Sequence, residues 1–480
     1  MNWLDRAIEA VSPARALERE RARMVLQTLA NYRSAGVERT SPSMRAGGGD
    51  ADAAAINARR RLSLLSRDAV RNNALAERAL QVVTNNVVGT GIHPKLVTAD
   101  KALADEFLAR VRATFDTTSV DYDGISTLAG LQRMQIRATA QDGGALLVWP
   151  DDRSSDFKVR MLEIDYLDDR LTGPIAASGN YLSEGIEYDP RGRVVAYHIY
   201  EEHPGAVVRT QFGLSLNSVR VDASRVIHLY RADRPGQRRG VSWFAPVLSD
   251  MVALADNDEA QLMRQKIAAC FAAFWKTDKM DAQAAGIPPT LAPGLIQQIG
   301  EGDEVTFANP PDVTGYDDFG KIHLRRIAMG LGLTYEELTG DLSNVNFSSA
   351  RLGRIAMGQN VEAWQWTMMI PRVCQPLGQW FLRSWVYEDP RMLQRLKSAR
   401  IEWSPPPPVI ADPKGETAVA VQRIEAGLSS RRREIRNLGY DAEDIDADIT
   451  SDPLASQFLG GAKPSVADQV DQIITERLGK

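Results

Sequence analysis

One arrangement in the sequence restricts the possible folds most strongly. A long amphipathic segment is followed by an insertion rich in proline and glycine, and then by a second helical segment. Residues 244–274 place their apolar side chains near one stripe, which predicts a long helix. Residues 286–315 contain many proline and glycine residues, which favours short strands and turns. Residues 318–330 have helical spacing again. The sequence therefore predicts two helices with a small module inserted between them.

The residues before this pair predict a mixed region of helices and strands. Apolar side chains recur at helical spacing in residues 59–88, 101–115 and 128–140. Strand-like segments follow at residues 145–149, 159–164, 185–188, 194–200 and 226–230. A turn sequence joins two of these strands, so residues 185–200 are expected to form a hairpin. Helices and strands in separate stretches indicate the α+β class.

The C-terminal part predicts a long irregular helix and then a separate unit. Residues 351–385 have helical spacing but contain Pro371 and Pro376, which should kink or break the helix. Four consecutive prolines at residues 405–408 indicate a rigid step at a domain boundary. Short helices are expected beyond it, at residues 414–426 and from residue 429 to residue 437.

The N-terminal 58 residues predict either an arm that reaches a neighbouring subunit or a disordered tail, rather than a domain. Residues 45–55 are small, polar and rich in glycine, as in a flexible linker. The arginine triplet at residues 59–61 follows directly, and a second triplet lies at residues 431–433. Short runs of charge are common on solvated helix surfaces, which is our interpretation of both triplets.

Composition excludes several classes of protein. The 480 residues contain 57 basic and 62 acidic side chains, a net charge of −5, so nucleic-acid binding by bulk positive charge is disfavoured. Cys270 and Cys374 are the two cysteines, too few for a disulfide framework or a cysteine-rich zinc site, and are expected to be core residues. No apolar run reaches the ~18 residues of a membrane-spanning helix, and no signal peptide is present. We expect a protein made and kept in a cytoplasm.

No set of residues predicts catalysis or a metal site. Residues 315–321 (GYDDFGK) have the glycine and lysine spacing of a phosphate-binding loop, but Ile322 replaces the hydroxyl residue that coordinates magnesium. The five histidines are scattered without metal-ligand spacing. Asp256, Asp258 and Glu259 are more consistent with a solvated helix face than with a carboxylate site. We therefore predict no enzyme activity, no cofactor and no metal.

Five segments, in a fixed order, carry a resemblance to a known family. They are residues 70–94 (VRNNALAERALQVVTNNVVGTGIHP), 185–200, 226–248 (VIHLYRADRPGQRRGVSWFAPVL), 326–352 (RIAMGLGLTYEELTGDLSNVNFSSARL) and 412–445. In order and spacing they resemble the lambda-type family of tailed-phage portal proteins.

The resemblance implies an α+β portal fold around an axial channel, in a ring of about twelve subunits. Its parts are expected in chain order: an arm (1–58), a wing (59–243), stem helices with an inserted clip (244–338, clip about 276–317), a tunnel loop with a long kinked helix (339–404), and a short crown with a tail (405–480). The ring would occupy one vertex of the capsid in a virion assembled in a bacterial cytoplasm.

The resemblance also implies a function and partners. The ring would pass double-stranded DNA during packaging and ejection, dock the large terminase subunit, contact the major capsid or scaffold protein, and later receive a head–tail adaptor. The residues expected to contact DNA are Asn344, Asn346, Ser348 and Ser349 in the tunnel loop and Lys321 and Arg325 in the stem. Ordinary ion pairing between helices is the simpler interpretation of the last two. The alternative functions are a capsid adaptor or scaffold that binds protein only, and an NTP-driven translocase that uses residues 315–321.

Overall fold

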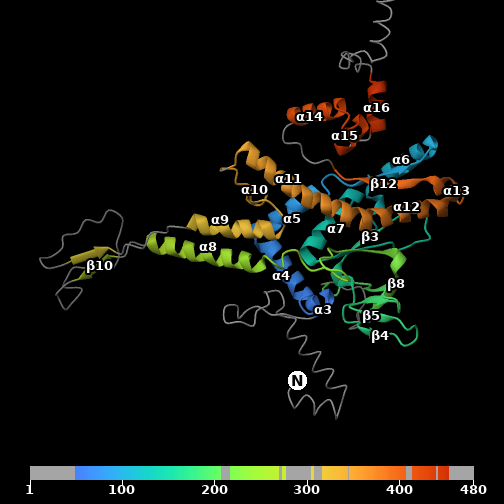
Figure 1. Cartoon of the computed structure of the whole chain (residues 1–480). Coiled ribbons are helices and arrows are strands. Elements are labelled where there is room, and N and C mark those ends of the chain that lie inside the picture. The colour runs from blue at the N-terminus through green and yellow to red at the C-terminus, as the bar shows by residue number, and fades with distance from the viewer. Residues whose placement is uncertain are drawn as a thin grey trace, which may run out of the picture.

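The computed structural model describes residues 49–206, 217–269, 273–276, 304–307, 316–343, 345–406, 413–438 and 442–452. Figure 1 shows a mixed body of helices and strands, from which α8 and α9 project to one side and α14, α15 and α16 to another. The helices of the N-terminal half are α3 (Ala51–Ala55), α4 (Arg59–Asn72), α5 (Ala74–Val87), α6 (Lys101–Thr114) and α7 (Leu128–Asp142). The helices and strands confirm the predicted α+β class.

The predicted helix over residues 59–88 is two helices, α4 and α5, because Asn73 interrupts it. Asn73 has extended backbone angles, and its side chain accepts a 2.9 Å hydrogen bond from the backbone N–H of Leu75. Asparagine is a favoured N-cap because its side-chain oxygen satisfies a free N–H of the first turn. Helical periodicity continues across the break, so the apolar pattern alone did not reveal it.

The strands form antiparallel sheets that lie beside the helices. One sheet has the order β3 (Arg160–Glu163), β2 (Ala145–Val148), β9 (Val226–Leu229), and every residue of β2 is buried. The second sheet has the order β4 (Gly173–Pro174), β5 (Tyr181–Ser183), β6 (Ile186–Tyr188), β7 (Val194–Tyr200), β8 (Ser218–Asp222). The pairing of β6 with β7 confirms the predicted hairpin.

A further two-stranded sheet joins β1 (His93–Val97) to β12 (Arg400–Ser404). Neither strand was predicted, because each is short and its partner lies far away in the chain. The pair links the segment after α5 to the segment that follows the long C-terminal helix.

The long C-terminal helix runs as three consecutive pieces. They are α11 (Phe347–Trp364), a π-helical segment (Gln365–Cys374) and α12 (Gln375–Glu388). Pro371 lies inside the π segment, and Pro376 lies in the first turn of α12. A proline removes one helical hydrogen bond, and a wider π turn absorbs the resulting misfit. The predicted irregularity at these prolines is confirmed, although the helix is not broken.

An aromatic core holds this helix against the body. Phe381 packs against Phe115 with ring centroids 4.5 Å apart, and Trp380 lies 5.7 Å from Trp149. Cys374 is fully buried, as predicted, and burial raises the pKa of its thiol. Cys270 lies outside the described residues.

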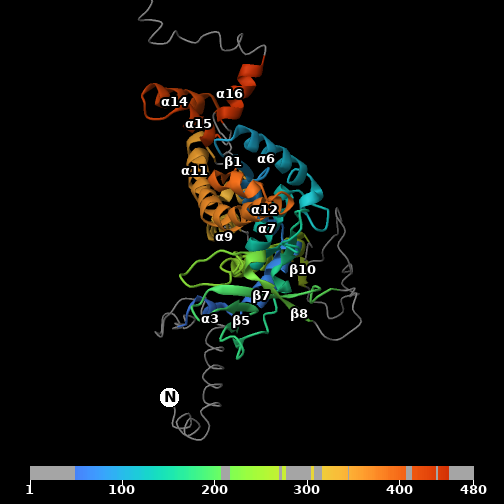
Figure 2. The same cartoon turned by 90° about the vertical axis from the view of Figure 1, so that its right-hand side faces the viewer.

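The predicted pair of helices with an inserted module is present, but the first helix ends earlier than predicted. Helix α8 (Leu248–Ala269) lies against α9 (Tyr316–Gly330), as Figure 1 shows. Figure 2 shows the body from the side, with α14, α15 and α16 above α11. The predicted helix to residue 274 is wrong, because residues 273–276 are strand β10 (Ala273–Lys276), paired with β11 (Glu304–Phe307). Its aromatic residues suit a paired strand as well as a helix. Most of the proline- and glycine-rich insertion lies outside the described residues.

The two ends of the described chain are also helical. Residues 51–55 form α3, with Ala55 buried, so this part of the expected flexible linker is wrong. The C-terminal helices are α14 (Pro413–Glu425), α15 (Arg431–Asn437) and α16 (Ala442–Ser451), of which α16 was not predicted. Short helices α10 (Tyr335–Thr339) and α13 (Met392–Arg395) complete the body. Within the described part of the chain, no helix has both the length and the apolarity needed to cross a membrane.

Candidate functional site

The loop between α10 and α11 begins with a fixed turn. Helix α10 ends at Gly340, whose φ of 72° is the left-handed conformation that glycine adopts without strain. The Asp341 carboxylate then accepts hydrogen bonds from the Ser343 hydroxyl (2.6 Å) and backbone N–H (3.0 Å) and from the Tyr335 hydroxyl (2.9 Å). These bonds, led by the Ser343 hydroxyl, lower the pKa of Asp341 to about 2. The carboxylate is therefore charged and committed to holding the turn.

The predicted DNA-contact residues of this loop are partly helical. Ser348 and Ser349 lie in the first turn of α11, and Asn346 is its N-cap. The Asn346 side chain accepts a hydrogen bond from the Ser349 N–H (2.8 Å), and the Ser349 hydroxyl accepts one from the Asn346 N–H (3.2 Å). This reciprocal capping box explains the pair without any ligand. Asn344 lies outside the described residues.

The structure brings Lys321 and Arg325 to the same surface. Both lie on α9, which contacts α10. The Arg325 guanidinium lies 5.7 Å from the centroid of the Tyr335 ring, and the charge of Lys321 contributes to the low pKa of Asp341. Among the described residues, Arg325 has its cation–π contact with Tyr335 and Lys321 its electrostatic interaction with Asp341, and neither forms a salt bridge. Through Tyr335 and Asp341, the stem residues Lys321 and Arg325 lie close to the start of the loop that leads to Asn346.

Two further exposed cations, on the neighbouring helix in sequence, were not predicted. Arg351 and Arg354 are exposed in the first half of α11, together with Leu352 (68% exposed) and Ile355 (52% exposed). Their spacing of three residues just after the Asn346 cap was the available signal, because residues three apart share a helix face. Helix α11 emerges from the body here with solvent on most of its sides.

The phosphate-loop alternative fails on geometry. Residues 316–321 of the GYDDFGK sequence form the first turns of α9, so their backbone does not adopt a glycine-rich nest. Asp256, Asp258 and Glu259 are exposed on α8, as predicted for a solvated face.

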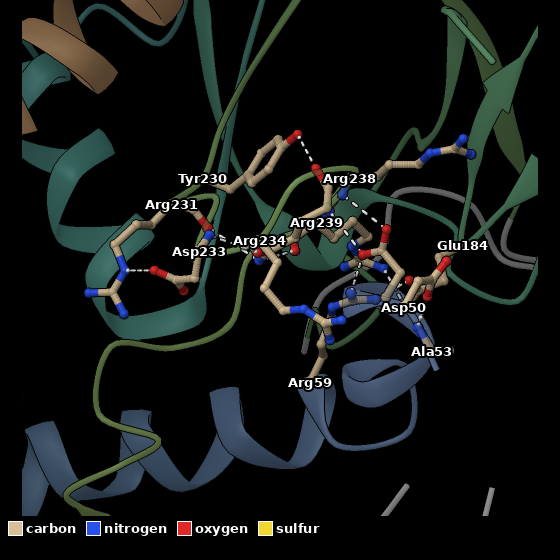
Figure 3. Close-up of polar contacts among 12 residues, drawn as sticks. Asp50, Ala53, Arg59, Glu184, Tyr230, Arg231, Asp233, Arg234, Arg238 and Arg239 are labelled. Carbon is tan, nitrogen blue, oxygen red and sulfur yellow. Dashed lines mark hydrogen bonds and ion pairs between the residues drawn. The ribbon is translucent and has the colours of Figure 1, made fainter. Parts of the chain in front are cut away.

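A second polar region, a cluster of buried charges, was not predicted (Figure 3). Arg59 is 6% exposed and donates hydrogen bonds to Asp52 and Glu184, so the solvated interpretation of this arginine is wrong. Arg239 lies 3.2 Å from Glu184, and Asp52 accepts a 3.0 Å hydrogen bond from the backbone N–H of Arg238. Burial lowers the pKa of Arg239. The cluster joins α3 and α4 to the β5–β6 turn and to the loop before α8.

Glu184 combines an unusual backbone conformation with burial of its charged side chain. Its φ of 49° is left-handed, and it is 5% exposed. At the next residue, Gly185, a Cβ atom would lie 2.6 Å from the backbone oxygen of Asp168, so only glycine fits. The tight turn between β5 and β6 therefore places the carboxylate between two buried arginines. The cluster ties α4 and the loop before α8 to this turn.

One group of potential metal ligands is present among the described residues. Ligand atoms of Glu163, Asp165 and His203 all lie within 4.8 Å of one another. The Arg67 guanidinium donates to Asp165 and lies 3.3 Å from Glu163. Arg67 also pairs with Asp142, so these side chains form an ion-pair network around one guanidinium.

Comparison with known proteins identifies the chain. The model of the lambda family of phage portal proteins matches residues 38–365, more than half of the sequence. The chain belongs to the lambda family of phage portal proteins. It is therefore a portal subunit, and the resemblance noted in the sequence is confirmed.

Curated relatives extend this likeness along most of the chain. The probable portal protein of Halomonas phage phiHAP-1 is 26% identical over 450 residues, covering 88% of this chain and 85% of that protein. Portal protein B of Escherichia phage lambda is 22% identical over 461 residues, covering 83% and 84%. A chain in the neck of a native gene transfer agent particle, computed with C12 symmetry, has a TM-score of 0.48 and 14% identity over 79% of this chain and 94% of that one.

The match to the portal family includes the whole candidate surface. Lys321, Arg325, Asn346 and the two arginines of α11 all fall inside the matched residues 38–365. Helices α12 to α16 lie beyond it. The residues most worth testing in this portal subunit are those of α9, the following loop and the first half of α11.

Proposed function

We propose that this portal subunit assembles into a ring of about twelve copies at one vertex of a capsid, and that double-stranded DNA passes through the axial channel during packaging and ejection. The proposal assigns α8 and α9 to the stem, β10 and β11 to the clip, residues 59–243 to the wing, and residues after 405 to the crown. The chain would act as a conduit without catalysis, cofactor or metal.

The observation that carries ring assembly is the exposed surface of the stem pair, α8 and α9. The inner ends of both helices lie in the core, at Met251 and Ile327. On its exposed face, α8 carries Val252 (59%), Leu262 (51%) and Met263 (54%) beside Asp256 and Glu259. Helix α9 exposes Phe319 (39%), Ile322 (50%) and Met329 (75%) beside Arg325 and Arg326.

These two surfaces complement each other. A solvated helix seldom exposes so many large apolar side chains without a partner to cover them. The exposed acids Asp256 and Glu259 of α8 and the exposed Arg326 of α9 carry opposite charges. We infer that α8 of one copy fits α9 of the next, with apolar side chains covered and these charges facing. Such a head-to-tail contact uses a different surface on each side of the subunit, and it closes into a ring when the rotation permits.

We place the DNA contact at the surface formed by α9, the following loop and α11. Lys321, Arg325, Arg351 and Arg354 supply cations at intervals, and Asn346 and Ser348 supply neutral polar groups. Asn344, between them in sequence, belongs to the same proposal. With a net charge of −5 on the whole chain, the ring would not bind DNA strongly enough to stop its passage.

The partners follow from this role. The clip would dock the large terminase subunit, the wing would face the major capsid or scaffold protein, and the assembled ring would receive a head–tail adaptor. The gene transfer agent chain with the similar fold belongs to a particle neck, which agrees with a place in the virion for this protein.

Native mass spectrometry with negative-stain imaging of the purified chain tests the proposal. We expect rings with a central hole wide enough for a DNA duplex and a mass near twelve or thirteen times 52.9 kDa. A compact monomer, at high concentration and with scaffold protein added, would instead support a capsid adaptor that binds protein only.

A further inference from the structure

A cavity of about 200 Å³ lies at the start of α4. Its walls include the first turns of α4, the turn between β5 and β6, strand β9 and the loop before α8. These parts contribute Arg59, Arg60, Glu184, His228 and Arg239 to the lining. Figure 3 shows Arg59, Glu184 and Arg239 close together. A cavity of roughly 150 Å³ holds a molecule the size of benzene, so this one has room for a small ligand.

Two buried nitrogen atoms of the lining have no hydrogen-bond partner within the described part of the chain. One is Nε of Arg59, which is 6% exposed and whose other nitrogens bind Asp52 and Glu184. The other is Nε2 of His228, which is 8% exposed. Buried polar groups in native proteins are nearly always hydrogen-bonded, because an unpaired one costs free energy. A ligand of this cavity would therefore carry acceptor atoms.

The start of α4 supplies further donors. Helix α4 has 14 residues, its N-cap is Ala58, and no side chain caps its first turn. The first N–H groups of an α-helix have no partner inside the helix, and with the helix dipole they favour a negative group. Oxyanions bind at such helix starts for this reason. The first turn reaches the cavity wall at Arg59 and Arg60.

The charges that act on His228 indicate the sign of the ligand. The lining as a whole is balanced, with four arginines and four acids. Burial, together with the charges of Arg239, Arg372 and Arg59, holds the pKa of His228 well below its usual range. The imidazole is therefore neutral, and it lies where arginine charges dominate. A negative group is favoured beside it, and Nε2 can donate to that group when it carries the imidazole proton.

The acids of the lining are directed toward other cations. Asp142 and Asp165 both bind Arg67, which lies outside the lining. Glu184 lies between two buried arginines, as described above. Asp169 is the fourth acid, and an exposed arginine of α4 balances it in number. A ligand with several acceptor oxygens can bind the unpartnered nitrogens without breaking these pairs.

We propose that this cavity binds a small oxyanion of the phosphate class. Its oxygens accept hydrogen bonds from Nε of Arg59, from Nε2 of His228 and from the first N–H groups of α4. The anion connects the start of α4 to strand β9. The site lies within one chain and does not depend on ring assembly.

Equilibrium dialysis of the full-length chain against radiolabelled inorganic phosphate tests the site, with ionic strength held constant by chloride. We expect saturable binding of one phosphate per chain, with a Kd of about 1 mM or lower. Arg60→Glu puts a negative charge at an exposed position of the lining and should weaken binding about tenfold. Arg61→Glu is the matched control, because Arg61 is the next residue of α4, is exposed and lies outside the lining, so its affinity should be unchanged.

A second variant tests the buried end of the cavity. His228→Phe keeps an aromatic ring but removes Nε2, so it should also weaken phosphate binding about tenfold, with circular dichroism confirming the fold. Competition by thymidine monophosphate would show that the phosphate arrives on a nucleotide, and lack of competition would identify free phosphate. Absence of saturable binding overturns the proposal, and so does an equal loss in Arg60→Glu and Arg61→Glu. Neither result affects the ring proposal.

Discussion

The body of this portal subunit and its projecting helices differ in how their charged side chains are paired. In the body, Arg59, Arg239 and Glu184 are buried and satisfy one another within one chain. On the stem pair, Asp256, Glu259 and Arg326 are exposed beside large apolar side chains and have no ion pair with another described residue. The body is therefore self-sufficient, whereas the projecting helices present surfaces that a partner would complete.

The largest expected effect is in the buried cluster. Glu184→Ala leaves Arg59 and Arg239 buried without their shared carboxylate, and removing one partner of a buried pair costs about 3–5 kcal/mol. The free energy of unfolding, from urea titration, measures this loss. Glu402→Ala, which removes the exposed Arg400–Glu402 pair, is the control and should cost less than about 1 kcal/mol. An equal loss of unfolding free energy in both variants would show that the buried cluster is no more important for stability than an exposed ion pair.

The stem pair should show the opposite behaviour, with assembly lost and subunit stability kept. Asp256→Arg with Glu259→Arg places like charges against Arg326 of the next copy, so we expect monomers in native mass spectrometry and an unchanged Tm of the subunit. Adding Arg326→Glu should restore part of the ring population.

The matched control for the stem variant reverses two exposed acids of the wing. Asp105→Arg with Asp116→Arg makes the same change in net charge and should still give rings. Rings formed by the stem variant itself would contradict the pairing of α8 with α9.

A smaller effect separates the two roles of Asn346. Asn346→Ala removes the N-cap of α11 and should cost about 1 kcal/mol, seen as faster hydrogen exchange in the first turn of that helix. Asn346→Asp keeps the cap, because a carboxylate also accepts the Ser349 N–H, but it places a negative charge at the proposed DNA surface. We expect slower DNA packaging with Asp and intact exchange protection. Normal packaging by Asn346→Asp would restrict Asn346 to its capping role.

The smallest effect is the pH response of the turn at Asp341. Its pKa is lowered to about 2, so its hydrogen bonds stabilise the fold above the ordinary carboxyl pKa and lose this contribution as pH falls from about 4 toward 2. Asp341→Asn should remove that part of the pH dependence. Thermal unfolding of both proteins at pH 5 and pH 2.5 makes the comparison, and identical shifts in Tm would show that the turn does not depend on the charge.

Structural features could be predicted from the sequence where the residues that determine them are adjacent in the chain. The hairpin of residues 185–200, the helical pair around the insertion and the irregular helix at Pro371 follow from spacing, turn residues and proline chemistry in adjacent residues. The break at Asn73 was within reach of the same reasoning, because an N-cap residue stands there. The residues proposed for DNA contact could be named from the family resemblance, but the cap formed by Asn346 and Ser349 shows that two of them already serve the helix.

By itself, the sequence determined the α+β class, the portal family and the order of the main elements, because these depend on patterns along neighbouring residues. Only the tertiary structure decided that Arg59 is buried against Glu184, that β1 pairs with β12, and that Lys321 and Arg325 lie beside the turn at Asp341. The first two depend on residues that are far apart in the chain, and the third depends on how α9 packs against the helix and turn that follow it. Burial and pairing at such distances follow from packing, which no local pattern encodes.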